Sequence, residues 1–282
     1  MNQEGRELVI RRILVALDAS PHSLSALAAA ADLAARFRAE LRGVFVEDAD
    51  LLRLAELPFA REISLFSVSR RQLDIHEVEW QLRAQARRVR QLLAATAARV
   101  QVSWSFRVAR GAIAAELLAA GSEADLIILG KAGRSLSMRR RLGSTARAIL
   151  AEGTSLTLIL EENACLRGPV LVIYDGSAFA RRSLVAAVAL VREEDGYLIA
   201  LILAEGLDEA QRLQAQVAGW LQGWPGRVQC CLLAESSVPR LVRTVRTAGC
   251  GTLVLPARSS LLHEEAILAL LVETDIPVLL VR

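Results

Sequence analysis

Short runs of consecutive apolar residues alternate along this chain with longer stretches in which apolar residues recur every three or four positions. The runs at 13–17 and at 126–129, within the expected strand 125–129, are continuous, which is typical of strands buried on both faces of a parallel sheet. In the stretch 21–38, Leu24, Leu27 and Ala31 lie on one helical face. A good N-cap, Ser20, precedes that stretch. The pattern therefore predicts an α/β protein.

The alternation of strands and helices occurs twice. In the first half we expect strands at 13–17, 41–46, 100–108, 125–129 and 156–160, with helices at 21–38, 73–99, 112–120 and 144–151. In the second half we expect strands at 170–175, 197–203, 228–233, 252–255 and 276–281, with helices at 177–191, 207–222, 238–248 and 261–273. Each half reads βαβαβαβαβ, which predicts a doubly wound, Rossmann-like sheet of five parallel strands.

This duplication divides the chain into two domains, 1–160 and 170–282, joined by the linker 161–169. One segment of the first domain, 47–72, is longer than an ordinary loop and contains a short apolar helix ended by Pro58. We interpret it as a surface excursion that packs on its own domain. The alternative is a lid near the carboxyl ends of the strands.

Composition excludes several classes of protein. Apolar residues make up 53% of the 282 residues, too many for a disordered chain. No apolar run approaches the roughly 18 residues of a membrane helix, and residues 1–12 have no signal-peptide core. We therefore expect a cytoplasmic protein without a membrane partner. Its four cysteines form no CxxC pair and are expected to be reduced and mostly buried. Its three histidines lack metal-ligand spacing, so no metal site is expected.

Charge is distributed unequally between the halves. Residues 1–160 hold 23 basic and 17 acidic side chains, a net charge of +6, whereas the remaining residues hold 11 and 14, a net charge of −3. All but one of the basic residues are arginine, a bias that a GC-rich genome explains. Because no stripe of aromatic and basic residues accompanies it, we expect no nucleic-acid partner. The positive first half favours an anionic ligand.

The glycine-rich segment 130–145 follows a buried strand and enters a helix, which is where open α/β sheets bind ligands. Gly130 and Gly133 allow backbone N–H groups to approach a phosphate. Gly143, Ser144 and Thr145 open a helix whose free N–H groups favour an anion. The segment is neither a P-loop nor a G-x-G-x-x-G turn. It has no acidic residue and five basic ones, Lys131, Arg134, Arg139, Arg140 and Arg141.

The spacing G-x2-G-x9-G-S at 130–144 resembles the nucleotide loop of the universal stress protein family. Three further segments are similar to that family: the first strand with its Asp at 16–20, Val-Phe-Val-Glu-Asp at 44–48, and the last strand at 276–281. With the duplicated strand order, the resemblance covers nearly the whole chain. It implies a tandem universal stress protein whose domains form an intrachain pseudo-dimer, with further homodimerisation left open.

The resemblance also implies roles for individual residues of the first domain. Asp18 and the backbone beside it would face the base and ribose, and Val46 would offer backbone contacts to adenine. The glycine loop would hold ribose and phosphates. On charge and position we add Lys131 and Arg134. The expected nucleotide-binding residues are thus Ala16, Leu17, Asp18, Val46, Gly130, Lys131, Gly133, Arg134, Gly143, Ser144 and Thr145.

Departures from the family pattern affect mainly the second domain. The first domain has only Leu156 in place of the usual Pro of the last strand. In the second, Pro256 replaces the first glycine, and counting back 13 residues from Pro277 reaches Glu264, followed by Glu265. Two carboxylates at the phosphate position would oppose an anion. We therefore expect a degenerate second site.

The resulting hypothesis is a stress-response regulator that binds one ATP, or another adenine nucleotide, with or without Mg, in its first domain. One alternative is a nucleotide-independent structural or adaptor protein of the same fold, with an unknown protein partner. The other is a slow nucleotide hydrolase or phosphotransferase. Because no His–acid pair lies near the loop, we expect no efficient catalysis and assign no catalytic residue.

Overall fold

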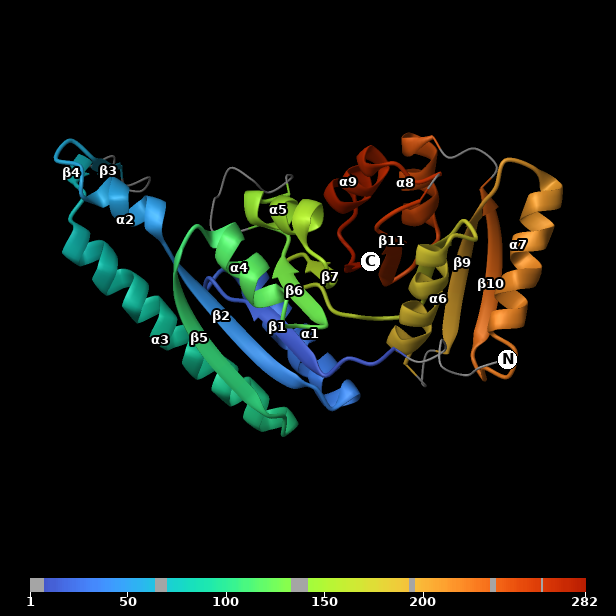
Figure 1. Ribbon diagram of the computed structural model, residues 1–282, viewed down its shortest axis with the longest axis horizontal. Helices are drawn as coiled ribbons and strands as arrows, with labels where there is room; N and C mark the ends of the chain where they lie inside the picture. The colour runs from blue at the N-terminus through green and yellow to red at the C-terminus, as the bar shows by residue number, and fades with distance from the viewer. Residues whose placement is uncertain (1–7, 64–69, 133–141, 193–195, 234–236, 260) are drawn as a thin grey trace.

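The computed structural model joins ten strands of the chain into a single sheet (Figure 1). It describes residues 8–63, 70–132, 142–192, 196–233, 237–259 and 261–282. The strand order is β10-β9-β8-β11-β12-β7-β6-β1-β2-β5. We call residues 8–160 the N-terminal half and residues 170–282 the C-terminal half. The division of the chain into domains at these positions stays a prediction.

Each half contributes five parallel strands in the same relative order. Numbered along its own half, the strands run 3-2-1-4-5, the doubly wound order that the sequence predicted. The N-terminal half supplies β1 (Arg12–Ala16), β2 (Glu40–Asp48), β5 (Trp104–Gly111), β6 (Leu126–Gly130) and β7 (Leu156–Leu160). The C-terminal half supplies β8 (Val170–Tyr174), β9 (Tyr197–Leu203), β10 (Arg227–Leu233), β11 (Thr252–Pro256) and β12 (Val278–Val281).

The two halves meet where their last strands pair. β7 and β12 run antiparallel, with Leu158 opposite Leu279 and Thr157 opposite Leu280. An antiparallel pair of equivalent strands is what a two-fold axis between the halves produces. The expected intrachain pseudo-dimer is therefore confirmed, and it forms by strand pairing between the two last strands.

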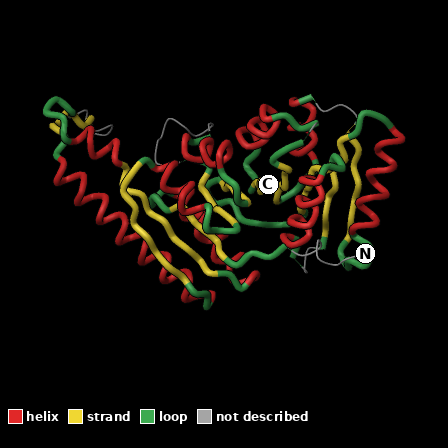
Figure 2. The backbone as a smooth tube through the Cα atoms, viewed as in Figure 1, coloured by secondary structure: helices red, strands yellow, loops and turns green. Residues whose placement is uncertain are grey.

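Helices cover both faces of the sheet (Figure 2). One face carries α1 (Pro21–Phe37), α3 (Ile75–Val100), α6 (Ala178–Leu190) and α7 (Leu207–Trp220). The other carries α4 (Ile113–Gly121), α5 (Ser144–Glu152), α8 (Val238–Thr247) and α9 (Glu264–Glu273). Successive strand residues alternate between the two apolar cores: Ile13 and Val15 belong to the first, Leu14 to the second. This burial on both faces explains the continuous apolar runs.

Two segments differ most from the elements that the sequence pattern predicted. Residues 100–103 are not strand, because α3 continues to Val100 and ends at Gln101 in the left-handed conformation (φ 55°). The segment after β2 contains the expected short helix, α2 (Ala49–Ala55), which ends before Pro58. It also contains the small antiparallel pair β3 (Arg61–Ile63) and β4 (Arg70–Gln72), and the sequence pattern did not predict this pair. Helix α2 buries Leu52 and Ala55.

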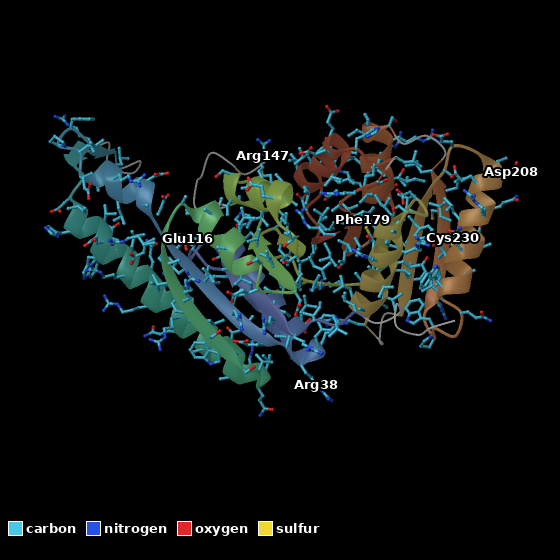
Figure 3. All side chains as sticks on the ribbon, viewed as in Figure 1. Arg38, Glu116, Arg147, Phe179, Asp208 and Cys230 are labelled. Atoms are coloured by element: carbon cyan, nitrogen blue, oxygen red, sulfur yellow. The ribbon has the colours of Figure 1, made fainter. Side chains whose placement is uncertain are left out.

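The cysteine prediction was only half right. All four thiols are free. However, only Cys250 is buried, whereas Cys165 is exposed and Cys230 and Cys231 are half-buried. Cys230 lies on β10, the strand at one end of the sheet (Figure 3). An edge strand has a neighbouring strand on one side only, so fewer residues cover its side chains.

Candidate functional site

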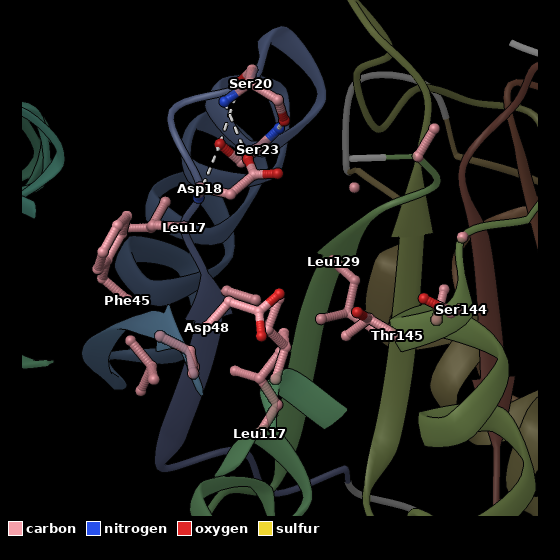
Figure 4. Close-up of a pocket in the computed structure, with 18 of the residues that line it drawn as sticks. Leu17, Asp18, Ser20, Ser23, Phe45, Asp48, Leu117, Leu129, Ser144 and Thr145 are labelled. Carbon is pink, nitrogen blue, oxygen red and sulfur yellow. Dashed lines mark hydrogen bonds between the residues drawn. The ribbon is translucent and has the colours of Figure 1, made fainter. Parts of the chain in front are cut away.

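A cavity of about 370 Å³ opens at the carboxyl ends of β1 and β6, where the strand order of the N-terminal half reverses. Such a switch point is the usual ligand site of an open α/β sheet. Figure 4 shows Asp18 and Ser20 on one side of the cavity, Ser144 and Thr145 on the other, and Leu129 between them. The volume lies within the roughly 300–1,000 Å³ of small-molecule sites.

The turn after β1 is fixed by local hydrogen bonds between residues two or three positions apart. The Ser20 N–H donates to Asp18 Oδ1 at 2.9 Å, and the Ser23 N–H donates to Ser20 Oγ at 3.1 Å, which caps α1. Ala19 between them has φ 62°, a left-handed conformation that this turn requires. Asp18 thus has one carboxylate oxygen committed to the turn and lies at the cavity wall.

Gly130 ends β6 against the first turn of α1. A Cβ at Gly130 would lie 2.7 Å from His22 Cβ and 3.0 Å from the His22 carbonyl carbon. Both distances are shorter than ordinary contact, and the second involves backbone that cannot rotate away. The glycine therefore permits close helix–strand packing, in addition to any contact with a ligand.

The amino end of α5 faces the cavity from the opposite side. Gly143 is its N-cap and has no side chain to accept a hydrogen bond, so no side chain caps the described first turn. Gly143, Ser144, Thr145 and Ala146 all line the cavity. The N–H groups of this first turn lie at the positive end of the helix dipole, an arrangement that suits an anion.

Backbone hydrogen bonds at Lys131 join the carboxyl end of β6 to β7 and to the amino end of α5. The Lys131 N–H donates to Leu160 O at 2.7 Å, and its carbonyl accepts from Gly143 N–H at 3.0 Å. The Lys131 ammonium, however, does not join the phosphate-facing groups. It forms an ion pair with Glu161 at 2.6 Å and donates to Val272 O and Thr274 O, at the carboxyl end of α9.

The structure brings nine of the eleven expected binding residues to this one cavity. They are Ala16, Leu17, Asp18, Val46, Gly130, Lys131, Gly143, Ser144 and Thr145. The other two, Gly133 and Arg134, lie outside the described residues, as do Arg139, Arg140 and Arg141. For Lys131, charge and position suggested a phosphate contact, whereas its ammonium lies among groups of the C-terminal half.

Sequence reasoning missed the outer wall of the cavity. Asp48, Leu51, Leu82 and Gln85 line it. Asp48 is also the N-cap of α2 and accepts from Asp50 N–H at 2.9 Å. The segment 47–72 therefore packs on its own half, through α2, and also reaches the cavity, as the lid alternative expected. A carboxylate at the carboxyl end of β2, Asp48, was the signal that could have indicated this wall.

Ion pairs hold this wall against the sheet. The Arg110 guanidinium of β5 bonds Glu47 of β2 at 3.0 Å and Glu79 of α3 at 2.8 Å. The hydrogen bond from Arg110 holds the pKa of the Glu79 carboxyl below its ordinary value. These pairs tie α3 to β2, which lines the cavity, and to the edge strand β5.

The equivalent position in the C-terminal half is filled. Strand register makes Ala16 equivalent to Ile173, which is fully buried, and Gly130 equivalent to Pro256. Pro256 lacks the N–H that a glycine loop offers. The α9 N-cap is His263, so the residue equivalent to Ser144 is Glu264, one position earlier than the count from Pro277 suggested.

The model of the universal stress protein family matches residues 10–159. The chain belongs to the universal stress protein family. The match spans the strands, the cavity and the glycine loop of the N-terminal half. No curated protein matches this universal stress protein in sequence.

Solved structures support the fold over the whole chain. A universal stress protein from Archaeoglobus fulgidus is 18% identical, covers 95% of this chain and 97% of its own, and has a TM-score of 0.71. A putative universal stress protein from Pseudomonas aeruginosa is 16% identical, covers 96% and 93%, and has a TM-score of 0.56. A universal stress protein in complex with cAMP is 18% identical and covers 55% of this chain and 100% of its own, but its TM-score of 0.35 is too low to support the fold.

Two further observations concern the described residues alone. They contain no group of three or more His, Cys, Asp or Glu side chains that could hold a metal ion. None of their helices is both long and apolar enough to cross a membrane.

Proposed function

We propose that this universal stress protein binds one adenine nucleotide, ATP in the first instance, in the cavity of its N-terminal half. We further propose that it acts as a nucleotide-dependent regulator in a stress response. The observation that carries the proposal is the amino end of α5, whose N-cap Gly143 supplies no side-chain acceptor and which faces a cavity at the switch point of the sheet. Backbone N–H groups at that end suit a phosphate chain.

The remaining walls suit the rest of a nucleotide. Val46, Ile113 and Leu117 provide an apolar surface that a purine ring can cover. Asp18 and Ser20 provide polar groups beside it for a ribose. The positive net charge of residues 1–160 adds a favourable field for an anion.

The geometry favours binding over turnover. Hydrolysis needs a base held on a water molecule and, in most nucleotide hydrolases, a bound metal ion. Asp18 and Asp48 both line the cavity, and the candidate base is Asp18, one of whose oxygens accepts the Ser20 N–H within the turn. The carboxylate therefore has a positioning role that requires no chemistry.

Calorimetric titration with ATP tests the proposal. We expect one site per chain, because Ile173 and Pro256 occupy the equivalent position in the C-terminal half. Ala16→Ile copies the larger side chain into the N-terminal cavity and should abolish binding while the fold is kept. Ala119→Ile adds the same atoms to an exposed position of α4 and should bind as the parent does. Two equivalent sites, or full ATP affinity in Ala16→Ile, would contradict the proposal.

A further inference from the structure

The single lysine of the chain is buried where the two halves meet. Lys131 is 4% exposed, and its ammonium donates to Thr274 O at 3.0 Å and Val272 O at 3.2 Å. These carbonyls are at the carboxyl end of α9, where the helix dipole is negative. Glu161, directly after β7, completes the ion pair at 2.6 Å. His22 Nδ1 lies 3.6 Å from the same carboxylate, a His–acid pair beside Lys131 that the sequence analysis did not expect.

A second cation makes the reciprocal contact across the pseudo-two-fold axis. Arg282 follows β12 as Glu161 follows β7. Its guanidinium donates to Ile149 O at 2.8 Å and to Leu150 O, in the last turn of α5. Each half therefore places a cation at the carboxyl end of the last helix of the other. In the N-terminal half, the elements held in this way are the loop start at Lys131 and α5, and both line the cavity.

We propose that the C-terminal half positions the nucleotide site of the N-terminal half through Lys131, which serves as a positioning residue rather than a phosphate ligand. The proposal rests on the proposed function for its ligand. Its structural basis is the backbone of Lys131, which bonds Leu160 on one side and Gly143 on the other. The side-chain anchor on α9 thereby acts on the described residues that flank 133–141, Lys131 directly and Gly143 through its hydrogen bond to Lys131 O.

The coupling works in both directions. If the anchor on α9 favours the loop geometry that binds nucleotide, bound nucleotide must favour the anchored arrangement of the halves by the same free energy. The C-terminal half, which lacks the glycine loop, thus regulates the nucleotide affinity of the N-terminal half. On this proposal the C-terminal half binds no nucleotide itself and supports the nucleotide site of the N-terminal half.

The variants must separate loop positioning from general loosening of the interface. Lys131→Met alone would leave the Glu161 carboxylate, 18% exposed, without its cation, which destabilises a fold strongly. Lys131→Met/Glu161→Gln removes both charges and keeps similar volumes. Arg36→Met is the matched control, because Arg36 also donates from one half to carbonyls at the end of a helix in the other, Ala189 O and Val191 O. Arg36 does not line the cavity.

Two measurements on the full chain decide the proposal. The first measurement needs no ligand and follows amide hydrogen exchange at Gly143, whose N–H donates a hydrogen bond to Lys131 O. We expect exchange at least about tenfold faster in Lys131→Met/Glu161→Gln and unchanged in Arg36→Met, since local opening depends on the anchor. The second is the ATP dissociation constant, which we expect to rise about tenfold in the double variant only.

Unchanged exchange and unchanged ATP affinity in the double variant would overturn the positioning role. Equal increases in the double variant and in Arg36→Met would also overturn it, because they would mean that any loss of contact between the halves loosens the loop. If the parent binds no ATP, the proposed function fails by itself, and the exchange comparison still decides whether Lys131 positions the loop.

Discussion

Gly130→Ala isolates the packing requirement at the end of β6. The new Cβ would lie 2.7 Å from His22 Cβ and 3.0 Å from the His22 carbonyl carbon, where ordinary contacts exceed 3.4 Å. His22 cannot move freely, because it lies in the first turn of α1, and Ser20 and Ser23 fix that turn. The clash must therefore be relieved by a shift of α1 away from the sheet.

The size of the effect follows from two opposing contributions. Overpacking of a well-packed region costs about 1–3 kcal/mol. Replacing glycine also restricts the unfolded chain, which returns about 0.4–1 kcal/mol. We expect a net loss of about 1–2 kcal/mol in the free energy of unfolding. For chains of roughly this size, that lowers the melting temperature by about 2–8 °C.

Thermal and urea unfolding, followed by circular dichroism, measure this change. The control is Gly219→Ala in α7, where a Cβ meets nothing within 4 Å and Gly219 is helical. There the same substitution should stabilise the protein by roughly 0.5–1 kcal/mol, because glycine weakens a helix. If Gly130→Ala is as stable as the parent, the close packing of β6 on α1 is refuted as the reason for this glycine.

Three further predictions concern the seam between the halves, the loop and a thiol. The isolated segment 1–162 exposes the β7 edge that β12 covers, so light scattering should show dimers or aggregates, not a stable monomer. If the arginines at 139–141 help to hold phosphates, ATP affinity should fall with added salt more steeply than adenosine affinity in parallel titrations. Burial raises the pKa of Cys250 to about 11, so its contribution to stability is complete below its ordinary pKa near 9 and is lost as the pH rises toward 11. Unfolding at pH 8 and pH 10.5 should therefore show a smaller loss in Cys250→Ala than in the parent, and mass spectrometry should find Cys165 alkylated before Cys250.

The sequence predicted the sheet well because its strands are buried on both faces. The run at 156–160 is β7 residue for residue, and the run at 197–203 is β9. Local patterns were weaker where an element is half exposed. Strand β5 begins at Trp104, which is 37% exposed, so its alternation did not mark where α3 ends.

Side-chain partners distant in sequence were beyond the reach of pattern analysis. The glycine loop and the resemblance to the universal stress protein family together indicated most of the residues that gather at the cavity. Nothing local to Lys131 indicates that Thr274, 143 residues later, supplies its acceptor. The placement of α9 depends on β7 pairing with β12, and only the assembled sheet determines which helix end receives this cation.

The antiparallel seam between β7 and β12 also limits which proteins this chain can combine with. A protein that pairs with a separate chain through its last strand can exchange partners, and two such proteins in one cell can then form mixed dimers. Here the partner strand is supplied by the same polypeptide and is present at high effective concentration whenever the protein is folded. The chain is therefore insulated from subunit exchange, and the ratio of glycine-loop half to supporting half is set at one to one by translation rather than by expression levels.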